Sequence, residues 1–434
     1  MQFPSPRRLA TAGWRRDPRW IMATLGMLYI AWGAWAPATA VTVTGTGAHR
    51  VQLKLPFEYL VLAPVTRFLD ELTLLDDRQH MAIAWTLVVI VVMVAMRTAM
   101  RTTCWRARTR ATVRASLVAF GVGLGVYVVG ALMPRPMASL AADDPAVLLV
   151  DFHSHTERSH DGRWRFDAES NRAWHAASGF HAAYVTDHQT MQAWQLVAAR
   201  GELASTRAAL REASIVAGTR DAVETTLLPG IESVVPGAHL NLLGVTASHL
   251  PLFAHRRNLD TLRLAALRAS DRPLALLTLP FDLGRAPHRP PRIDAIELTN
   301  GAPKGLRFSR ENRTRILQLA ESLDVPLVAS SNHHGWGSTA VAWTAIRIPG
   351  WQQLDPLALD AAIRSALGGP AGDVFVVERA GLPAASSTAG HLLTLPRLAL
   401  HAARMATAPE RLAGLGWGLA VLVVWRRRPR RAQA

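Results

Sequence analysis

Residues 147–155 read VLLVDFHSH, an apolar run that leads directly into two histidines separated by one serine. The run from Val147 to Val150 has the composition of a buried strand, in which successive side chains point to opposite faces. His153 and His155 are two positions apart, so strand alternation places both imidazoles on one face. Two neighbouring imidazoles can bind one divalent metal ion. The segment therefore predicts a strand that ends in a metal site.

Three later segments repeat the arrangement of an apolar run followed by polar side chains. The runs end in Thr186-Asp187-His188, in Gly230-Ile-Glu232 and in Ser331-Asn332-His333-His334. Parallel strands of a barrel bring their carboxyl ends together at one mouth. Segments that are far apart in the sequence can therefore build one site. Helical runs between the strands indicate alternating β and α elements, which favours a parallel sheet.

In their order and spacing, these segments resemble the PHP (polymerase and histidinol phosphatase) superfamily of metal-dependent phosphoesterases. The resemblance rests on D-x-H-x-H-T-x-x-S from Asp151, followed by T-D-H, G-x-E and S-N-H-H-G, and it covers roughly residues 146–350. It implies an α/β fold, a distorted (β/α)7 TIM-like barrel, and hydrolysis of a phosphate ester through a metal-activated water. The Trp174-His175 pair and the His-Gly-Trp-Gly ending resemble the membrane-attached members.

The resemblance also implies two groups of metal ligands. The first group consists of His153, His155, Glu232 and Asn332, and the second of Asp161, His188 and His334. Asn332 stands where the family usually has aspartate. The first motif is one residue longer than its common form, so His160 remains an alternative to Asp161.

A third metal site would need Glu232 as a bridge, together with His239 and a further histidine. Leu279 of Thr278-Leu279-Pro280 stands where that histidine belongs, so we expect this site to be lost. A mixed set of imidazoles and carboxylates suits zinc, manganese or iron equally. We therefore expect two divalent ions of one of these metals, with the binding of a third left open.

The resemblance assigns roles in the reaction as well. The expected catalytic residues are Glu232, His334 and Asp187, and the expected substrate-binding residues are Glu297, Asn300 and Arg163. Glu297 and Asn300 follow a predicted strand, and the Arg163 guanidinium can meet an anionic phosphate. We expect the remaining histidines, among them His175, to be solvated or on helix surfaces.

Long uncharged runs on both sides of this domain predict transmembrane helices. Three runs precede the domain, at about 20–40, 80–98 and 115–133, and a shorter one at about 409–425 follows it. A hydrocarbon core about 30 Å thick needs about 20 helical residues, so the last run could also lie in the membrane interface. The predicted organisation is a membrane region at 1–136, a PHP-like domain at 137–387 and a C-terminal segment with a basic tail at 388–434.

The distribution of arginine predicts the orientation in the membrane. The chain has a net charge of +16, with arginines concentrated in residues 1–19, 97–114 and 426–431. The positive-inside rule places these stretches in the cytoplasm and the catalytic domain outside it, in a multi-pass protein of a bacterial-type cell membrane. The basic charge then belongs to the membrane flanks, so the expected partners are a lipid bilayer and a small phosphorylated substrate, without nucleic acid. Residues 1–40 also fit a cleavable signal peptide.

These features predict a membrane-anchored, metal-dependent phosphoesterase. The alternative is a metal-binding sensor or pseudoenzyme of the same fold, favoured by Asn332 and Leu279. An amide oxygen removes one negative charge from the site, and leucine offers no ligand atom. Metal binding without hydrolysis would distinguish the alternative from the enzyme.

Overall fold

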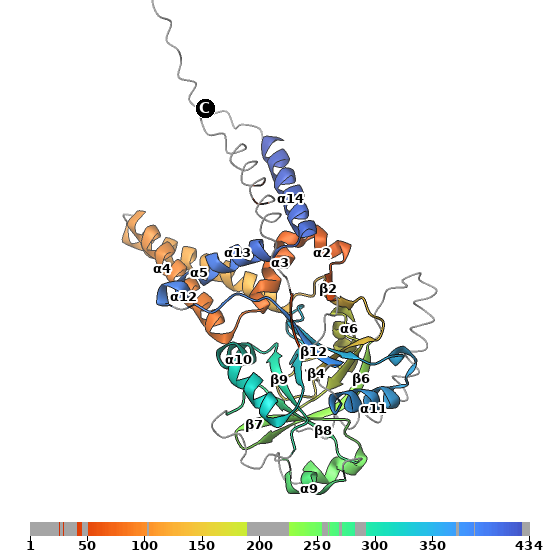
Figure 1. Cartoon of the computed structure of the whole chain (residues 1–434). Coiled ribbons are helices and arrows are strands. Elements are labelled where there is room, and N and C mark those ends of the chain that lie inside the picture. Colours follow the sequence, from red (N-terminus) through yellow and green to blue (C-terminus); the bar gives the residue numbers. More distant parts are fainter. Residues whose placement is uncertain are drawn as a thin grey trace, which may run out of the picture.

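The computed structural model describes residues 26, 29, 41–45, 51–101, 104–188, 225–253, 259, 261–268, 271–282, 292–369, 373–385 and 387–427. Within them, a domain built on a sheet lies below a group of helices (Figure 1). The strands are β1 (Val41–Thr44), β2 (Val51–Lys54), β3 (Ser139–Ala142), β4 (Val147–Ser154), β5 (Ala182–Val185), β6 (Thr226–Val235), β7 (Ala238–Leu243), β8 (Leu274–Thr278), β9 (Ala295–Asn300), β10 (Leu327–Ser330), β11 (Ala342–Arg347) and β12 (Val374–Arg379).

The helices belong to both parts of the molecule. They are α2 (Phe57–Val61), α3 (Ala63–Thr73), α4 (Asp77–Arg101), α5 (Trp105–Leu132), α6 (Ala168–Ala177), α9 (Thr261–Ala266), α10 (Pro303–Leu323), α11 (Pro356–Leu367), α12 (Thr388–Leu392), α13 (Thr394–Met405) and α14 (Ala408–Arg427), with short 3-10 helices η1 (Ala247–Phe253) and η2 (Trp351–Gln353). The N-termini of α6, α11 and α12 are capped by a side chain. The side chain of Asp355, for example, accepts hydrogen bonds from the first amides of α11, and Pro356 occupies the first helical position.

Ten strands form one sheet in the order β1-β12-β11-β4-β5-β6-β7-β8-β9-β10. Neighbours β4, β5 and β6 are parallel, as are β8, β9 and β10, whereas β7 is antiparallel to β6 and to β8. β1 and β11 both pair antiparallel with β12, and β11 pairs antiparallel with β4. The described chain thus has a mixed, curled sheet that is not a clear form of the distorted (β/α)7 TIM-like barrel that we expected. One reason is local, because Pro236 and Gly237 join β6 to β7 as a tight hairpin, with Gly237 at φ 81°.

The sheet curls until β10 approaches β11 and β4. The Thr344 hydroxyl on β11 accepts a hydrogen bond from the Ala329 amide of β10 and donates one to the Ala329 carbonyl, both at 2.7 Å. One buried cluster takes apolar side chains from every strand between β4 and β12. Beyond the strand ends, Ser154 and His333 form a parallel bridge. The curl therefore brings the first and fourth motifs of the sequence together.

Helices cover the outside of the curled sheet. Ile316 and Ala320 of α10 pack on a cluster drawn from β6 to β10, while Trp174 of α6 packs on a cluster that includes Trp343 of β11. α11 packs beside the sheet near β6 and β11 (Figure 1). This cover leaves the carboxyl ends of β4, β5 and β6 for the polar segments that follow them.

Two described helices are long and apolar enough to cross a membrane. The apolar windows of α4 and α5 have mean hydropathies of 2.1 and 1.7, and only 6% of each window is buried. They coincide with the spans expected at 80–98 and 115–133, and they pack against each other. α14 coincides with the span expected at 409–425, but it does not meet the same criterion. The span expected at 20–40 lies outside the described residues, apart from Gly26 and Tyr29.

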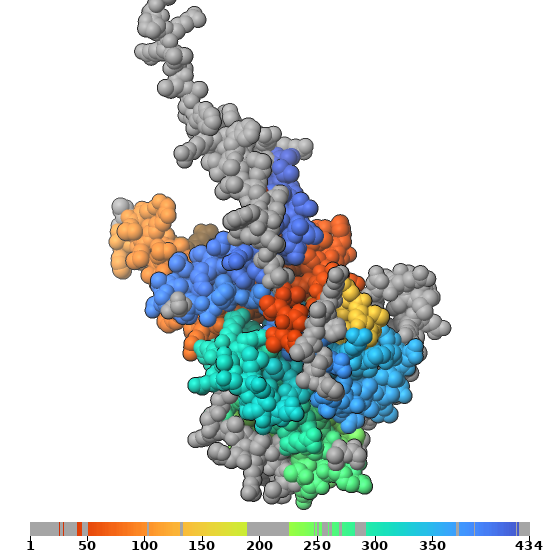
Figure 2. Space-filling model, in the orientation of Figure 1, coloured from red at the N-terminus to blue at the C-terminus, as the bar shows by residue number. Residues whose placement is uncertain are grey.

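Parts of residues 41–45 and 51–79, which we assigned to the membrane region, contact the domain. β1 is an edge strand of the main sheet, and β2 pairs with β3 just before β4. After α3, Asp76 forms an ion pair of 3.1 Å with Arg310 of α10, and the Gln79 side chain donates to the Leu382 carbonyl. In Figure 2 the orange helices and blue α13 form one continuous mass above α10. Described segments before residue 137 therefore contact the domain, and the domain boundaries stay a prediction.

Candidate metal centre

Glu232 of β6 lies among four imidazoles. Its Oε2 is 3.1 Å from His153 Nε2 and 3.3 Å from His155 Nε2, so the two histidines of the first motif face one carboxylate oxygen. The same Oε2 is 3.3 Å from His188 Nδ1, and Oε1 is 2.6 Å from His239 Nδ1. These contacts arise because β4, β5 and β6 are parallel neighbours whose ends meet. The predicted convergence of the first three motifs is present in the structure.

Asp161 and His334 extend this arrangement toward solvent. Asp161 Oδ2 is 3.3 Å from His188 Nε2, and Oδ1 is 3.3 Å from His334 Nδ1. The rings of His155 and His334 stack, with centroids 4.1 Å apart. The side chain of Asp161 is 39% exposed and that of His334 is 20% exposed, whereas His155 is fully buried. The cluster thus has a buried inner end at His155 and an open outer end at Asp161.

The contacts form four overlapping groups, each with three ligand atoms within 4.8 Å of one another. The groups are His153, His155 and Glu232; His155, Asp161 and His334; His160, Asp161 and His188; and His188, Glu232 and His239. Each group shares one residue with the next, and the last shares Glu232 with the first. We call these eight residues the histidine cluster. It contains both candidates, His160 and Asp161, that the sequence left open.

Burial and charge set the protonation of the inner end. Burial lowers the pKa of His153, but the carboxylates of Glu232 and Glu297 outweigh this effect and raise it to about 10. Burial would raise the pKa of Glu232, yet the surrounding imidazoles hold it well below its usual range. For His155, burial and the other imidazoles hold the pKa well below its usual range. Glu232 is therefore anionic and His155 is neutral.

The surroundings of His155 indicate whether these residues fit a metal ion. Neither of its ring nitrogens has a hydrogen-bond partner, although the residue is fully buried. Leaving a buried polar group unpaired costs on the order of 1–3 kcal/mol. A divalent cation near Nε2 would use the imidazole lone pair and the charge of Glu232 together. The donors are imidazoles and carboxylates, which suit zinc, manganese or iron, so the residues present fit a divalent metal.

A second layer of buried groups orients His153. Glu297 Oε1 lies 2.9 Å from His153 Nδ1, while Glu297 Oε2 accepts hydrogen bonds of 2.8 Å from the Leu279 amide and from the Asn300 side chain. Such a contact fixes the ring so that the other nitrogen faces the metal site. Glu297 and Asn300, expected to bind substrate, are both fully buried beneath His153. Leu279 is also buried and offers no ligand, as expected.

His175 is a buried residue near the site that the sequence analysis misplaced. Instead of lying on a helix surface, it is fully buried, and its Nε2 is 2.7 Å from Asp151 Oδ2. Asp151 also accepts from the amides of His153, at 3.2 Å, and Ser331, at 2.8 Å, and so joins the first motif to the fourth. A signal was present in α6, because Asn171, Trp174 and His175 have the spacing of one helix face.

Asp187 acts on the loop after β4. It is fully buried, and its two carboxylate oxygens accept hydrogen bonds of 2.7 Å from the amide and the hydroxyl of Thr156. No described contact joins this carboxylate to the histidine cluster. Its contacts indicate that Asp187 positions the first motif and acts on the site through Thr156.

Asn332 and Arg163 lie around His334. Asn332 has φ 44°, a left-handed conformation that asparagine adopts more readily than most residues, and its Oδ1 is 3.0 Å from His334 Nε2. The Arg163 amide donates to the His334 carbonyl at 2.9 Å. The guanidinium of Arg163 lies 5.7 Å from the centre of the Phe166 ring. Metal binding by Asn332 and substrate binding by Arg163 stay predictions.

Comparison with known proteins adds two distant likenesses. No family model matches the chain, and no curated protein matches it significantly. The structure of PsfC from Pseudomonas syringae is similar at 16% identity, covering 60% of this chain and 99% of PsfC with a TM-score of 0.34. A provisionally assigned metal-dependent phosphoesterase from Bifidobacterium adolescentis is similar at 15% identity, covering 50% of this chain and 95% of that one with a TM-score of 0.30. At these TM-scores, neither likeness assigns a fold or a function to this chain.

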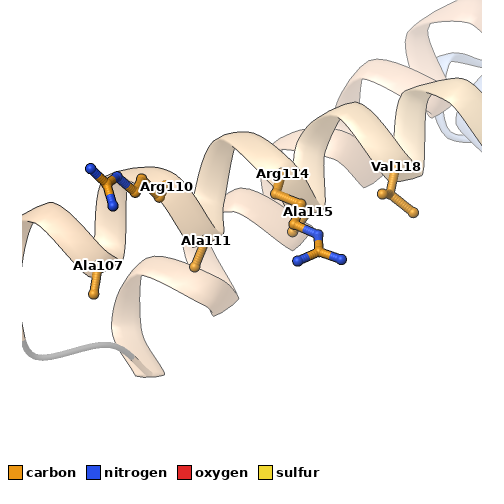
Figure 3. A pocket seen from close by; sticks show the side chains of 6 residues that line it. All are labelled: Ala107, Arg110, Ala111, Arg114, Ala115 and Val118. Atoms are coloured by element: carbon orange, nitrogen blue, oxygen red, sulfur yellow. The ribbon is translucent and has the colours of Figure 1, made fainter.

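A separate hollow of about 520 Å³ lies along α5 (Figure 3). It is lined by Ala107, Arg110, Ala111, Arg114, Ala115 and Val118. None of these residues belongs to the histidine cluster, and all come from one helix. The hollow is therefore a feature of the arginine-rich end of α5 and not part of the candidate metal centre.

Proposed function

We propose that the protein is a metal-dependent phosphoesterase of PHP type, with the histidine cluster as its metal centre and the curled sheet as a variant of that superfamily's (β/α)7 barrel. The observation that carries the proposal is the inner end of the cluster. There, a fully buried imidazole without hydrogen bonds faces an anionic carboxylate at 3.3 Å. A divalent cation beside this pair would give the unpaired imidazole a partner and would add positive charge next to the carboxylate.

The chain offers two sets of ligands. His153, His155 and Glu232 would hold one ion, while Asp161, His188 and His334 would hold a second. His239 lies on the far side of Glu232, where the set is one ligand short because of Leu279. When bound, two such ions lower the pKa of a coordinated water and polarise a phosphoryl oxygen.

Buried carboxylates of the chain orient the ligands of the metal centre. Glu297 holds His153 Nδ1, so that Nε2 faces Glu232, and Asp151 fixes the backbone of both the first and the fourth motif. The outer end, at Asp161 and His334, is exposed enough to receive a substrate. The Arg163 backbone lies next to this end, where its amide donates to the His334 carbonyl. The Arg163 guanidinium would supply positive charge for the oxygens of a small phosphorylated substrate.

The test uses the full chain, purified in detergent, stripped with a chelator and reloaded with Mn²⁺, Zn²⁺ or Fe²⁺. We expect hydrolysis of p-nitrophenyl phosphate or bis(p-nitrophenyl) phosphate that depends on added metal. Glu232→Gln is the matched control, because it keeps the shape of the side chain and removes its charge. Absence of hydrolysis with all three metals would contradict the proposal.

A metal-binding sensor is the second candidate function. It is favoured by Asn332, which removes a carboxylate from the expected ligands, and by Leu279, which fills the place of a third-site histidine. Asn332 lowers the negative charge of the site, and Leu279 lowers the number of ligands. Stoichiometric binding of metal by wild type, without turnover of either phosphate ester, would favour this function.

We further propose that α4 and α5 cross a bilayer and hold the domain outside the cytoplasm, with segments 20–40 and 409–425 as additional spans. β1 and β2 pair with strands of the domain, which requires residues 41–44 and 51–54 and the domain to lie on one side of the α4 and α5 pair. Two helices that cross and return satisfy this requirement. The arginines of residues 97–114 favour the cytoplasm for the opposite end.

Reporter fusions test this topology. A reporter that is active only outside the cytoplasm should work when fused at Ser387 and fail when fused at Ala111 or Ala434. Activity at Ala111 would reverse the orientation. Equal activity at Ser387 and Ala111 would contradict the crossing itself.

A further inference from the structure

The loop from Ser331 to Thr339 carries His334 and is held firmly at its first half. The Ser331 amide donates to Asp151, the His155 amide donates to the His333 carbonyl at 2.8 Å, and the Arg163 amide donates to the His334 carbonyl. All three contacts come from β4 or from the segment just after it. These contacts hold the loop on the side that precedes Gly335, so the placement of the His334 side chain also depends on how the following residues are held.

The second half of the loop depends on other contacts. Gly335 and Gly337 have φ values of 84° and 86°, in the left-handed region that glycine enters freely. Glycines give the backbone many alternatives, so the local sequence does not determine the path after His334. The path is fixed where the Thr339 hydroxyl donates to Asp70 Oδ1 at 2.8 Å and accepts from Arg135 Nη2 at 3.0 Å.

Asp70 belongs to α3, in the helical part of the chain. It is fully buried, and Arg135 contacts its Oδ1 at 3.1 Å. Its Oδ2 accepts from Arg379 Nη1 at 3.1 Å and from the Tyr59 hydroxyl at 3.0 Å. We call Asp70, Tyr59, Arg135, Arg379 and Thr339 the Asp70 cluster. Four groups from four segments hold this carboxylate, so its position is closely defined.

The contact with Thr339 is not needed to neutralise Asp70. Two guanidinium groups and a tyrosine hydroxyl already satisfy both carboxylate oxygens. What the threonine hydroxyl adds is a fixed distance between α3 and the end of the loop. Ser338 lies in the same interface, with its hydroxyl 3.4 Å from the Met133 carbonyl after α5.

We propose that Asp70 is a positioning residue for His334, acting through the Thr339 hydroxyl, so that the helical part of the chain helps to set the geometry of the metal centre. This inference rests on the proposed metal site. It assigns to α3 a part in metal binding in addition to its packing role, and it implies that a fragment beginning at residue 137 would have a weakened second set of ligands.

The test compares three variants of the full chain in detergent. Thr339→Val keeps the shape of the side chain and removes only the hydroxyl that meets Asp70. Thr339→Ser restores a hydroxyl and should rescue the effect. Thr66→Val is the matched control. Thr66 is a buried threonine as well, but it belongs to α3 and donates to the Tyr59 carbonyl at 3.3 Å. No described hydrogen bond joins it to the loop.

Mn²⁺ affinity is measured by competition with a chelator, alongside the thermal midpoint of each variant. We expect Thr339→Val to weaken binding of the more weakly held ion about tenfold, since distant supports of metal ligands often have effects of this size. Thr66→Val and Thr339→Ser should bind as wild type does. Both valine variants should lose similar thermal stability, so that only the metal affinity separates them.

The outcomes distinguish the two proposals. Wild-type affinity in Thr339→Val, or equal loss of affinity in Thr339→Val and Thr66→Val, overturns the positioning role and leaves the metal centre standing. Failure of wild type to bind Mn²⁺, Zn²⁺ or Fe²⁺ overturns the proposed function and this inference together.

Discussion

The histidine cluster and the Asp70 cluster are both buried and polar, but they compensate their charges in different ways. In the Asp70 cluster, the cations are Arg135 and Arg379, and both belong to the chain. In the histidine cluster, the acids Glu232 and Asp161 are surrounded by imidazoles, and none of its eight members is lysine or arginine. Both oxygens of Asp70 accept hydrogen bonds, whereas both nitrogens of His155 lack them.

This difference shows how one chain uses buried charge for two purposes. A cluster that contains its own cations is complete as soon as the chain folds, so its disruption is felt in stability. A cluster of carboxylates and imidazoles without lysine or arginine can be completed by a metal ion from solution, so its disruption should change the metal affinity. Substitutions in the Asp70 cluster should therefore act first on stability and those in the histidine cluster on metal affinity, with the contact between Thr339 and Asp70 adding an effect on metal affinity.

Asp70→Asn should have the largest effect. Arg379 is almost fully buried, and burial would lower its pKa, but Asp70 outweighs this effect and raises it. Removing the negative charge leaves this guanidinium without its closest anion, which costs about 3–5 kcal/mol in comparable buried pairs. Thermal unfolding of the full chain in detergent should show a midpoint several degrees lower, whether or not metal is present. An unchanged midpoint would mean that the Asp70 cluster does not stabilise the fold.

Glu232→Gln should have the next largest effect, this time on metal. The amide keeps the shape of the side chain but withdraws charge from two of the four ligand groups. We expect Mn²⁺ affinity to fall about 100-fold or more, against about tenfold for His334→Ala, which removes an imidazole ligand from one group. Competition with a chelator measures both values. Equal metal content in wild type and Glu232→Gln would refute a bridging role for Glu232.

Asn332→Asp should have a smaller effect in the opposite direction. The side chain is already 3.0 Å from His334 Nε2, and aspartate tolerates the left-handed backbone of this position. An added carboxylate should tighten Mn²⁺ binding about tenfold and leave the thermal midpoint of the metal-free protein unchanged. Titration of wild type and variant side by side provides the measurement. Unchanged or weaker binding would exclude position 332 from the ligands.

Glu311→Gln should have the smallest effect of all. Its ion pair with Arg78 is short, at 2.6 Å, but the two side chains are 43% and 61% exposed. Exposed pairs contribute about 0–1 kcal/mol, because water already solvates both charges. Neither the thermal midpoint nor the Mn²⁺ affinity should change measurably. A large loss in either would show that exposure is a poor guide to the strength of ion pairs in this chain.

Much of the candidate site could be predicted from the sequence. His153, Glu232 and His334 each follow an apolar run, and the ends of neighbouring strands meet however the rest of the sheet is connected. The short spacing within each motif is also local information. Prediction of these ligands therefore did not require the correct number of strands.

The rest depends on contacts between distant segments. The sequence VTVT of β1 favours a strand, but nothing in it indicates pairing with β12. The contact between Glu297 and His153 could not be predicted, because it depends on the three-dimensional packing of the curled sheet. His175 was misplaced for the same reason, since its contact with Asp151 requires α6 to lie against β4.

The pairing of β1 with β12 also determines the order in which the protein can fold during synthesis. Val41–Thr44 leaves the ribosome early, but its neighbour Val374–Arg379 is made only after β2 to β11. At about 5–20 residues per second, this delay is on the order of tens of seconds. All strands that carry the histidine cluster are complete before this edge of the sheet can close. A chain that stopped before Val374 would therefore keep β1 as an unpaired edge, available for pairing with other chains.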